Sequence, residues 1–344
     1  MILNSKLKLV PLGASLALCG LGLAGNAEAN AYSLSYDNIS NFLIPNPTNV
    51  VFGTPSVSSA DSASMNGSGI SNNSTATTPY GPSDTKIATV GTPTEGEDAY
   101  MPLGQTGNYA WGDGDVFAQQ TNNTYTSSSQ CAAGGCGHFQ NAAESNMTLG
   151  TAAAAGNNNS GTFMTVPITV SNSGTFTMEF NAEPYLQTFL AANSKAGSQA
   201  AADLSVTATL YSLDAAGNTT GTVMTWTPNG NSATDHTISG GVTVSGISDP
   251  QTLNITSTQL LPGGTTTYDP FGATFGTGTG SGGLYSITVG GLGSLNGSSA
   301  PSYQLALAMK EDVAVAAVPE PANVALFMVG LGLVGAAKLR RRKA

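Results

Sequence analysis

Histidine is the side chain most often used for acid–base catalysis near neutral pH, and this 344-residue chain has only two, His138 and His236. Neither lies at a spacing from Cys, His, Asp or Glu that is typical of a catalytic group. No glycine-rich phosphate loop precedes a lysine, so the sequence shows no nucleotide site. We therefore expect that this protein is not an enzyme and needs no cofactor.

The segment CAAGGCGH brings together the residue types that bind zinc, namely Cys131, Cys136 and His138. A zinc site needs a fourth ligand, and two cysteines separated by four residues are a weak signature of one. In an oxidising compartment a disulfide that closes a small loop is the better interpretation. The sequence predicts a Cys131–Cys136 disulfide and no metal site, with zinc binding as the alternative.

Two acidic segments, TEGEDAY and WGDGDVF, offer carboxylates of the kind that coordinate Ca²⁺. Their acidic residues are Glu95, Glu97, Asp98, Asp113 and Asp115. Neither segment follows the EF-hand pattern, which requires further oxygen ligands and a late glutamate. We expect solvated loop carboxylates here rather than a calcium site.

Aromatic side chains can stack on sugar rings, which makes them the remaining candidates for a binding site. Trp226 lies in an alternating segment that indicates a strand, so we expect it in the core. Trp111 and Tyr109 lie in a Gly-rich segment. A loop there would leave Trp111 free to contact a polysaccharide.

Short β-strands are the elements that must position these residues. Alternating apolar and polar runs recur between turn signals throughout the chain. The runs are AYSLSY, TFMTVPITV, TFTMEF, DLSVTATLYSL, GTVMTWTP, HTISGGVTVSGI, TLNITSTQLL, LYSITVGGL and SYQLALAMKEDVAVAAV. They predict an all-β fold, an antiparallel β-sandwich-like domain over 30–317 with long Gly/Ser/Asn-rich loops.

Three local features refine this prediction. The segment DAAGNTT predicts a hairpin turn in which Gly217 and Asn218 are able to adopt positive φ. The segment 181–202 predicts a strand that bends at Pro184 and continues into a loop or a short helix. Residues 57–161 are poor in apolar runs and predict long flexible loops.

The N-terminus has the pattern of a secretory signal peptide over residues 1–29. Lys6 and Lys8 precede the apolar stretch LVPLGASLALCGLGLAG, and the small residues Ala27 and Ala29 then form an A-x-A cleavage site. We expect cleavage after Ala29, with Ala31 as the second choice. Cys19 follows an apolar run and offers a lipoprotein alternative, but the bulky Leu18 before it is unusual for acylation, so the cysteine is expected to leave with the signal.

The exported part of the chain is strongly acidic. Seven of the ten Lys and Arg residues lie in the signal and the C-terminal tail, and only one of the twenty acids, Glu28, lies in the signal. Three cations therefore stand against nineteen acids, a net charge of about −16. Such a surface lacks the cations that bind phosphates, which excludes nucleic acid as a partner.

The C-terminal tail has the chemistry of a short membrane anchor. Residues 322–337 carry no formal charge and show no polar face of the kind that a buried soluble helix presents. A transmembrane helix over about 322–339 is expected, although at about 24 Å the uncharged run is slightly short of a hydrocarbon core. The cations that follow are Lys338, Arg340, Arg341, Arg342 and Lys343. By the positive-inside rule they keep the C-terminus in the cytoplasm and leave everything before Val318 outside.

A proline-bracketed glutamate precedes this anchor. Pro319 and Pro321 hold Glu320 in an extended peptide just outside the bilayer. Val318-Pro319-Glu320-Pro321, the apolar segment and the terminal cations together resemble a PEP-CTERM sorting signal over 318–344. The resemblance implies processing near Glu320 by an exosortase, a membrane-embedded cysteine transpeptidase-like enzyme of Gram-negative bacteria that make exopolysaccharide. Val318, Glu320 and both prolines are then substrate residues rather than catalytic ones.

Two further segments, AYSLSYDNISNFLI at 31–44 and residues 180–218, resemble a subfamily of exosortase-dependent surface-associated proteins. The resemblance implies an inner-membrane-anchored intermediate that is delivered to the cell surface or extracellular matrix. We expect a structural or adhesive, non-enzymatic surface or biofilm-matrix protein. The alternative is a carbohydrate-binding module, with or without Ca²⁺, that tethers exopolysaccharide.

Overall fold

The alternating runs of the sequence become antiparallel β-strands. The structure, a computed structural model, describes residues 30–45, 47–76, 80–84, 88–91, 107–119, 137–148, 154–194, 196–273, 275, 282–297 and 299–318. These residues form eighteen strands and no helix, which confirms the prediction of an all-β antiparallel fold. The predicted signal peptide, Cys131, Cys136 and the tail beyond Val318 lie outside the described residues.

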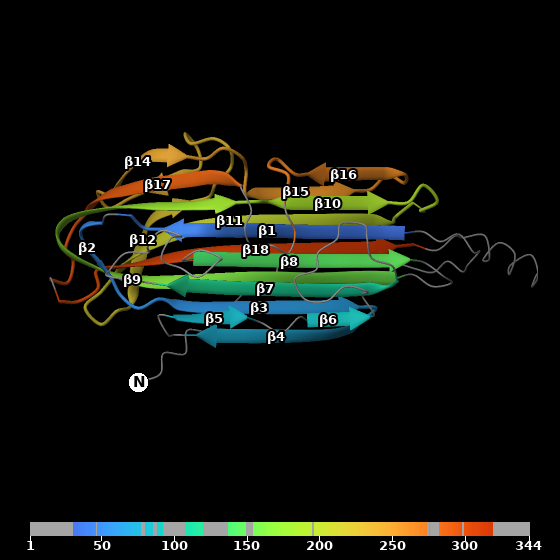
Figure 1. The fold of residues 1–344 in the computed structure, drawn as a ribbon, viewed down its shortest axis with the longest axis horizontal. Helices are drawn as coiled ribbons and strands as arrows, with labels where there is room; N and C mark the ends of the chain where they lie inside the picture. The colour runs from blue at the N-terminus through green and yellow to red at the C-terminus, as the bar shows by residue number, and fades with distance from the viewer. Residues whose placement is uncertain are drawn as a thin grey trace, which may run out of the picture.

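The strands form two sheets, and sheet I contains the N-terminal strand at its centre. Across this sheet the order is β14 (Thr243–Ser248); β17 (Gly283–Leu292) and β16 (Gly264–Tyr268); the second part of β9 (Ala154–Ala182) and β10 (Tyr185–Leu190); β1 (Asn30–Leu43); β8 (Gly137–Thr148); β7 (Tyr109–Gln119); and the short β5 (Tyr80–Asp84) and β6 (Ala88–Gly91). Figure 1 shows these strands running parallel to the long axis of the molecule.

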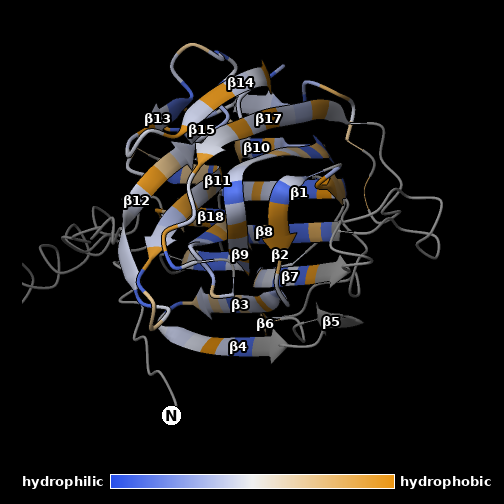
Figure 2. Cartoon of the chain, turned by 90° about the vertical axis from the view of Figure 1, so that its left-hand side faces the viewer, coloured by the Kyte–Doolittle hydropathy of each residue, from blue (hydrophilic) through white to orange (hydrophobic). Residues whose placement is uncertain are grey.

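Sheet II contains the C-terminal strand at its centre. Its order is β4 (Ser68–Ala76); β3 (Ser56–Met65) and β2 (Thr48–Phe52); the first part of β9; β18 (Tyr303–Ala317); β11 (Gln199–Leu213); β12 (Thr219–Trp226) and β15 (Asn254–Gln259); and β13 (His236–Ile238). In the view along the strands, the two sheets lie face to face (Figure 2).

Strand β9 belongs to both sheets. Residues 154–168 pair with β18 in sheet II, and after a bend residues 174–182 pair with β17 in sheet I. Gly174 lies at this corner, where a Cβ atom would be only 2.7 Å from Val50 Cγ2. The sequence pattern shows two runs here, and a single strand that changes sheets joins them. Through such pairings the described strands form one closed β-structure, flattened into two facing layers.

An apolar core fills the space between the layers near the corner of β9. The ring of Phe180 stacks on Tyr285 with 5.4 Å between ring centroids and contacts Trp226 at 5.7 Å. Phe52 and Phe176 meet edge to face at 5.4 Å. All five side chains are buried, so removal of their apolar surface from water stabilises this half of the domain.

The other half of the interlayer space is polar, and we call it the polar interlayer. Its inward-facing residues are Ser33, Ser35, Asp37, Asp61, Gly112, Gly114, Asn141, Ser145, Asn158, Ser160 and Glu311. The sheets approach closely here, since a Cβ on Gly112 would lie 2.6 Å from the carbonyl oxygen of Asn159. Serine hydroxyls bridge the gap: Ser33 Oγ donates to Ala201 O at 2.7 Å, and Ser160 Oγ donates to Asp113 O at 2.6 Å.

Several segments that the sequence predicts as loops between 57 and 161 are strands. Residues 56–65 and 68–76 form the β3–β4 hairpin, and β9 begins within the segment TAAAAGNNNSG. Inward positions of β3 alternate as Val57, Ser59, Asp61 and Ala63. Because these side chains are small or polar, their hydropathy contrast is too weak for the alternation to reveal a strand.

The predicted hairpin turn is present between β11 and β12. Gly217 has φ 83°, as expected, but Asn218 does not adopt positive φ. Its backbone N–H instead donates to Asp214 Oδ1 at 2.8 Å, as does that of Ala216 at 2.9 Å. The predicted break at Pro184 separates β9 from β10, and residues 191–194 and 196–198 form turns and loop, the first of the two expected alternatives.

Both ends of the described chain lie at one end of the sandwich, which we call the terminal pole. Ala31, near the start of β1, packs in one small apolar cluster with Val315 and Ala317 at the end of β18. Figure 1 shows the start of β1 and the end of β18 at the same side of the molecule. The corner of β9 lies at the opposite pole.

Candidate functional site

The aromatic candidates of the sequence lie on the outer face of sheet I. Gly112 and Gly114 of β7 face sheet II, so the alternation of the strand directs Tyr109 and Trp111 outward. We call this cluster the aromatic face. It consists of Tyr32, Leu34, Tyr36, Tyr109, Trp111, Ala142 and Tyr185, against which Phe189, Ala273 and Phe275 pack.

Glu144 of β8 binds both aromatic residues that the sequence suggested as sugar-binding candidates. Tyr109 Oη donates to its Oε1 at 2.8 Å, and Trp111 Nε1 donates to its Oε2 at 2.8 Å. The carboxylate is fully buried, so both hydrogen bonds form away from competing water. This clamp holds the tyrosine and the tryptophan in single orientations.

The aromatic face is covered, and the expectation of a free Trp111 in a loop is wrong. Trp111 belongs to β7 and is only 3% exposed. Its neighbouring glycines serve the close approach of the two sheets rather than a loop. The ring of Phe275 lies 5.0 Å from Tyr36 and 5.0 Å from Tyr185, centroid to centroid, and forms part of the cover. A sugar could reach Trp111 only if the cover moved.

His138 lies on the same face of sheet I as Glu144, six residues earlier in β8. Its Nε2 is 2.8 Å from Asn38 Oδ1, and Asn38 Nδ2 donates to Glu183 Oε2 at 3.5 Å. Burial lowers the pKa of His138 to about 4, so the ring is neutral at pH 7. Because the partner of Nε2 is an amide, this pair lacks the hydroxyl or thiol that a histidine base activates.

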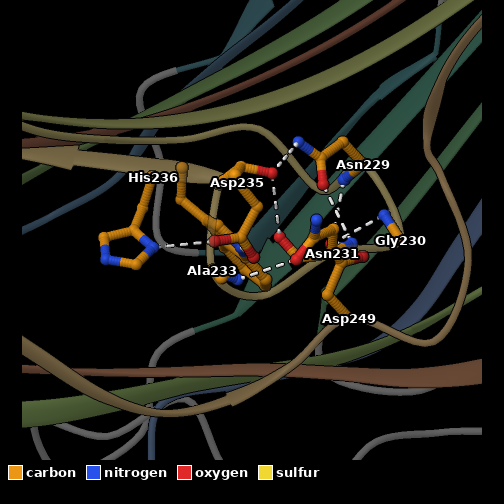
Figure 3. A network of polar contacts seen from close by, with 9 residues as sticks. Asn229, Gly230, Asn231, Ala233, Asp235, His236 and Asp249 are labelled. Carbon is orange, nitrogen blue, oxygen red and sulfur yellow. Dashed lines mark hydrogen bonds and ion pairs between the residues drawn. The ribbon is translucent and has the colours of Figure 1, made fainter.

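The second histidine belongs to a polar loop network (Figure 3). Its Nδ1 lies 2.7 Å from Asp235 Oδ1, and Asp235 Oδ2 accepts a hydrogen bond from Trp226 Nε1 at 2.8 Å. The network therefore ties β13 to the apolar core, where Trp226 lies as the sequence predicts.

Asp249 organises the adjoining loop of this network. Its Oδ2 accepts hydrogen bonds from the backbone N–H groups of Asn229, Gly230 and Asn231 at 2.9, 2.8 and 3.1 Å. Burial, with a smaller contribution from the Asp235 carboxylate, raises the pKa of Asp249 despite these donors. Three donors on one oxygen satisfy the backbone of a tight loop, so this arrangement is structural.

The acidic candidates for calcium do not meet in a described site. Asp113 and Asp115 occupy outward positions of strand β7. The expectation of a solvated loop carboxylate is wrong for Asp113, which is buried. Glu95, Glu97 and Asp98 lie outside the described residues. Within the described part of the chain, no group of three or more His, Cys, Asp or Glu side chains is arranged to hold a metal ion.

Two carboxyl groups of the polar interlayer have strongly perturbed acidity. Burial raises the pKa of Asp37 to about 8, and the nearby Glu183 carboxylate adds to this effect, while backbone N–H groups of Asn38 and Glu183 oppose it. Burial also raises the pKa of Glu311 well above its usual range, with a further contribution from Asp37. Asp37 is therefore mainly protonated at neutral pH, and burial favours the same protonated form of Glu311.

At the terminal pole the structure places the first residue of the predicted sorting motif. The backbone N–H of Val318 donates to Ser198 Oγ at 3.0 Å, in the loop between β10 and β11. Pro319, Glu320, Pro321 and the cations of the tail lie outside the described residues, as do Ala27 and Ala29. The part of the chain that is described holds no helix long and apolar enough to cross a bilayer.

No protein-family model, curated protein or solved structure matches this chain.

Proposed function

We propose that this chain is an exported surface or biofilm-matrix protein that an exosortase sorts through its C-terminal tail. Residues 1–29 act as the signal peptide, 30–317 form a structural or adhesive domain without enzymatic activity, and 318–344 form the sorting signal with a transmembrane helix at about 322–339. The protein passes through an inner-membrane-anchored intermediate on its way to the surface or matrix of a Gram-negative bacterium.

The position of the domain ends carries this proposal. Strand β1 begins at Asn30, directly after the predicted cleavage at Ala29, and β18 ends at Ala317, directly before the sorting motif. Val318, the last residue that the structure describes, still contacts the domain, because its backbone N–H donates to Ser198 Oγ. In the sequence, Glu320 follows Val318 by two residues. This spacing suits a peptide that an enzyme must grip in extended form.

The mass of the mature C-terminus tests the proposal. The full chain is expressed in a host that carries an exosortase, and we expect a mature form that ends near Glu320. Replacing Pro319, Glu320 and Pro321 together with Ala should leave the protein inserted but uncleaved. A Pro319→Ala/Pro321→Ala variant that keeps the glutamate separates the role of the carboxylate from that of the extended backbone. A stable surface form that ends at Ala344, with unchanged sorting of the triple variant, would refute the proposal.

The aromatic face supports a second candidate function, binding of exopolysaccharide. Its four tyrosines and Trp111 are residue types that stack on sugar rings, and a sugar reaches them only when the cover of this face moves. Retention of the full chain on a polysaccharide matrix, with and without Ca²⁺, measures this activity. We expect Trp111→Ala to abolish retention and Trp226→Phe, in the core, to leave it unchanged. If retention does not depend on Trp111, the aromatic face is not the polysaccharide-binding site.

A further inference from the structure

The turn between β15 and β16 exposes two adjacent leucines at the terminal pole. Leu260 is 59% exposed and Leu261 is 74% exposed, the highest value among the large hydrophobic side chains of the described residues. Neither belongs to an apolar cluster of the domain. An adjacent exposed pair at the tip of a turn is unfavourable in water and is typical of a surface that meets another apolar phase.

This turn lies beside the point where the tail leaves the domain. The backbone N–H of Gly263 donates to Leu190 O at 2.8 Å, and a Cβ on Gly263 would lie 3.5 Å from Ala192. The loop that contains Ala192 also holds Val318, through Ser198 Oγ. In Figure 1 the β15–β16 turn, the β10–β11 loop and the end of β18 all lie at one end of the molecule.

The length of the tail places this pole close to a bilayer. Four residue steps separate Val318 from Ala322, where the uncharged apolar run begins. Even fully extended, these steps cover at most about 14 Å. The headgroup layer on one side of a bilayer is about 5–8 Å thick. An inserted tail therefore holds the terminal pole within about 9 Å of the headgroup layer.

The charges of the two neighbouring segments suit the same surface. Residues 191–198 and 259–264 contain no Asp or Glu, although the exported chain is strongly acidic. The anionic headgroups of a membrane repel carboxylates, so segments without them meet no such repulsion. The opposite pole, by contrast, carries Asp214 in the β11–β12 turn.

We propose that Leu260 and Leu261 insert into the lipid bilayer that holds the tail, so that the anchored domain touches the membrane at two points. This inference rests on the proposed function, because it requires an inserted tail. The second contact restricts rotation of the domain about the tail. It also fixes the height of Glu320 above the bilayer, where the processing enzyme must reach it.

Lipid photocrosslinking in proteoliposomes tests this contact. A benzophenone amino acid is introduced at Leu261 in the full chain, and at Leu295 as the matched control. Leu295 is 51% exposed, also lies in a turn, and belongs to the β17–β18 connection at the opposite pole. We expect lipid adducts at position 261 and at least about tenfold fewer at position 295.

A second measurement places the probe at Ala192, which is exposed beside the turn. Here the Leu260→Ser/Leu261→Ser variant should lower lipid adducts by about tenfold, whereas Leu295→Ser should not change them. Equal labelling at 261 and 295 in protein that resists carbonate extraction would overturn the inference and leave the anchor intact. Protein that carbonate extracts from the vesicles would overturn both the inference and the proposed anchor.

Discussion

The two halves of the interlayer space are built on opposite principles. Near the corner of β9, large aromatic and aliphatic side chains keep the sheets apart and exclude water. Near the terminal pole, Gly, Ser and Asn let the sheets approach until a backbone atom of one faces a glycine of the other. The apolar half derives its stability from buried area, and the polar half derives it from hydrogen bonds across a narrow gap.

This difference shows that a sandwich can be held together without a uniformly apolar interior. The condition is that the buried polar groups are hydrogen-bonded or neutral. Ser33 and Ser160 meet it by donating to backbone carbonyl groups of the facing sheet. Asp37 meets it by remaining protonated at neutral pH, and burial shifts Glu311 in the same direction. The polar half should therefore respond to pH through Asp37.

The largest expected effect concerns Asp37. Its carboxyl is protonated in the folded protein up to about pH 8 but ionises from about pH 3.8 in the unfolded chain. Between these values only the unfolded state releases this proton, so the contribution of Asp37 to stability is greatest below pH 3.8 and falls until pH 8. The loss is on the order of 5 kcal/mol. Asp37→Asn should remove this loss, as measured by chemical denaturation across the range.

Asp214 provides the control for that measurement. Hydrogen bonds from the side chain and backbone of Asn218 lower the pKa of this exposed carboxyl, so its contribution to stability is lost as the pH falls. Asp214→Asn should leave the loss of stability toward pH 8 unchanged. If wild type and Asp37→Asn lose stability equally between pH 4 and 8, a neutral Asp37 is wrong.

The apolar half is tested by Trp226→Ala. This side chain is fully buried against Phe180, and its indole N–H bonds to Asp235. We expect a loss of about 3–5 kcal/mol in the free energy of unfolding, with no dependence on Asp37 protonation. Trp226→Phe should cost less, because only part of the volume and the hydrogen bond are lost. A Trp226→Ala variant within about 1 kcal/mol of wild type would contradict an aromatic core here.

A glycine pair tests the close approach of the sheets. In Gly112→Ala the new methyl group would lie 2.6 Å from the carbonyl oxygen of Asn159, so backbone must shift, at a cost of about 1–3 kcal/mol. In Gly161→Ala the nearest atom, Met309 O, is 3.6 Å away. That variant should match wild type or gain up to about 1 kcal/mol. Equal thermal denaturation midpoints for the two variants would show that the gap is wider than described.

The smallest effect concerns a single hydrogen bond between the sheets. Ser33→Ala removes the bond to Ala201 O and should cost about 1 kcal/mol in urea denaturation. Ser64, which donates to Asn157 O at 3.2 Å in an exposed position, is the matched control. Ser64→Ala should stay within about 0.5 kcal/mol of wild type. If Ser33→Ala is as stable as the Ser64→Ala control, the serine hydrogen bonds between the sheets do not stabilise the polar half.

The alternation of residues was sufficient to predict an all-β fold, because the strands of the apolar half show strong hydropathy contrast. It failed for β3 and β4, since a run such as SVSSADSASM shows almost none. The aromatic candidates Tyr109 and Trp111 could be selected from their types alone. Their partner Glu144 lies more than thirty residues away in the chain, and only the β7–β8 register brings the three together.

Local chemistry along the chain by itself determined the strands of the apolar half, the Gly217 turn, the acidic charge and the expectation that both termini are processed. These properties depend on each residue and its near neighbours. The tertiary structure alone decided which carboxyl groups are buried, that Trp111 is covered, and that the β10–β11 loop contacts both Gly263 of the β15–β16 turn and Val318. The physical reason is that the facing of the two sheets and the change of sheet along β9 arise from pairings between distant segments, which no local pattern encodes.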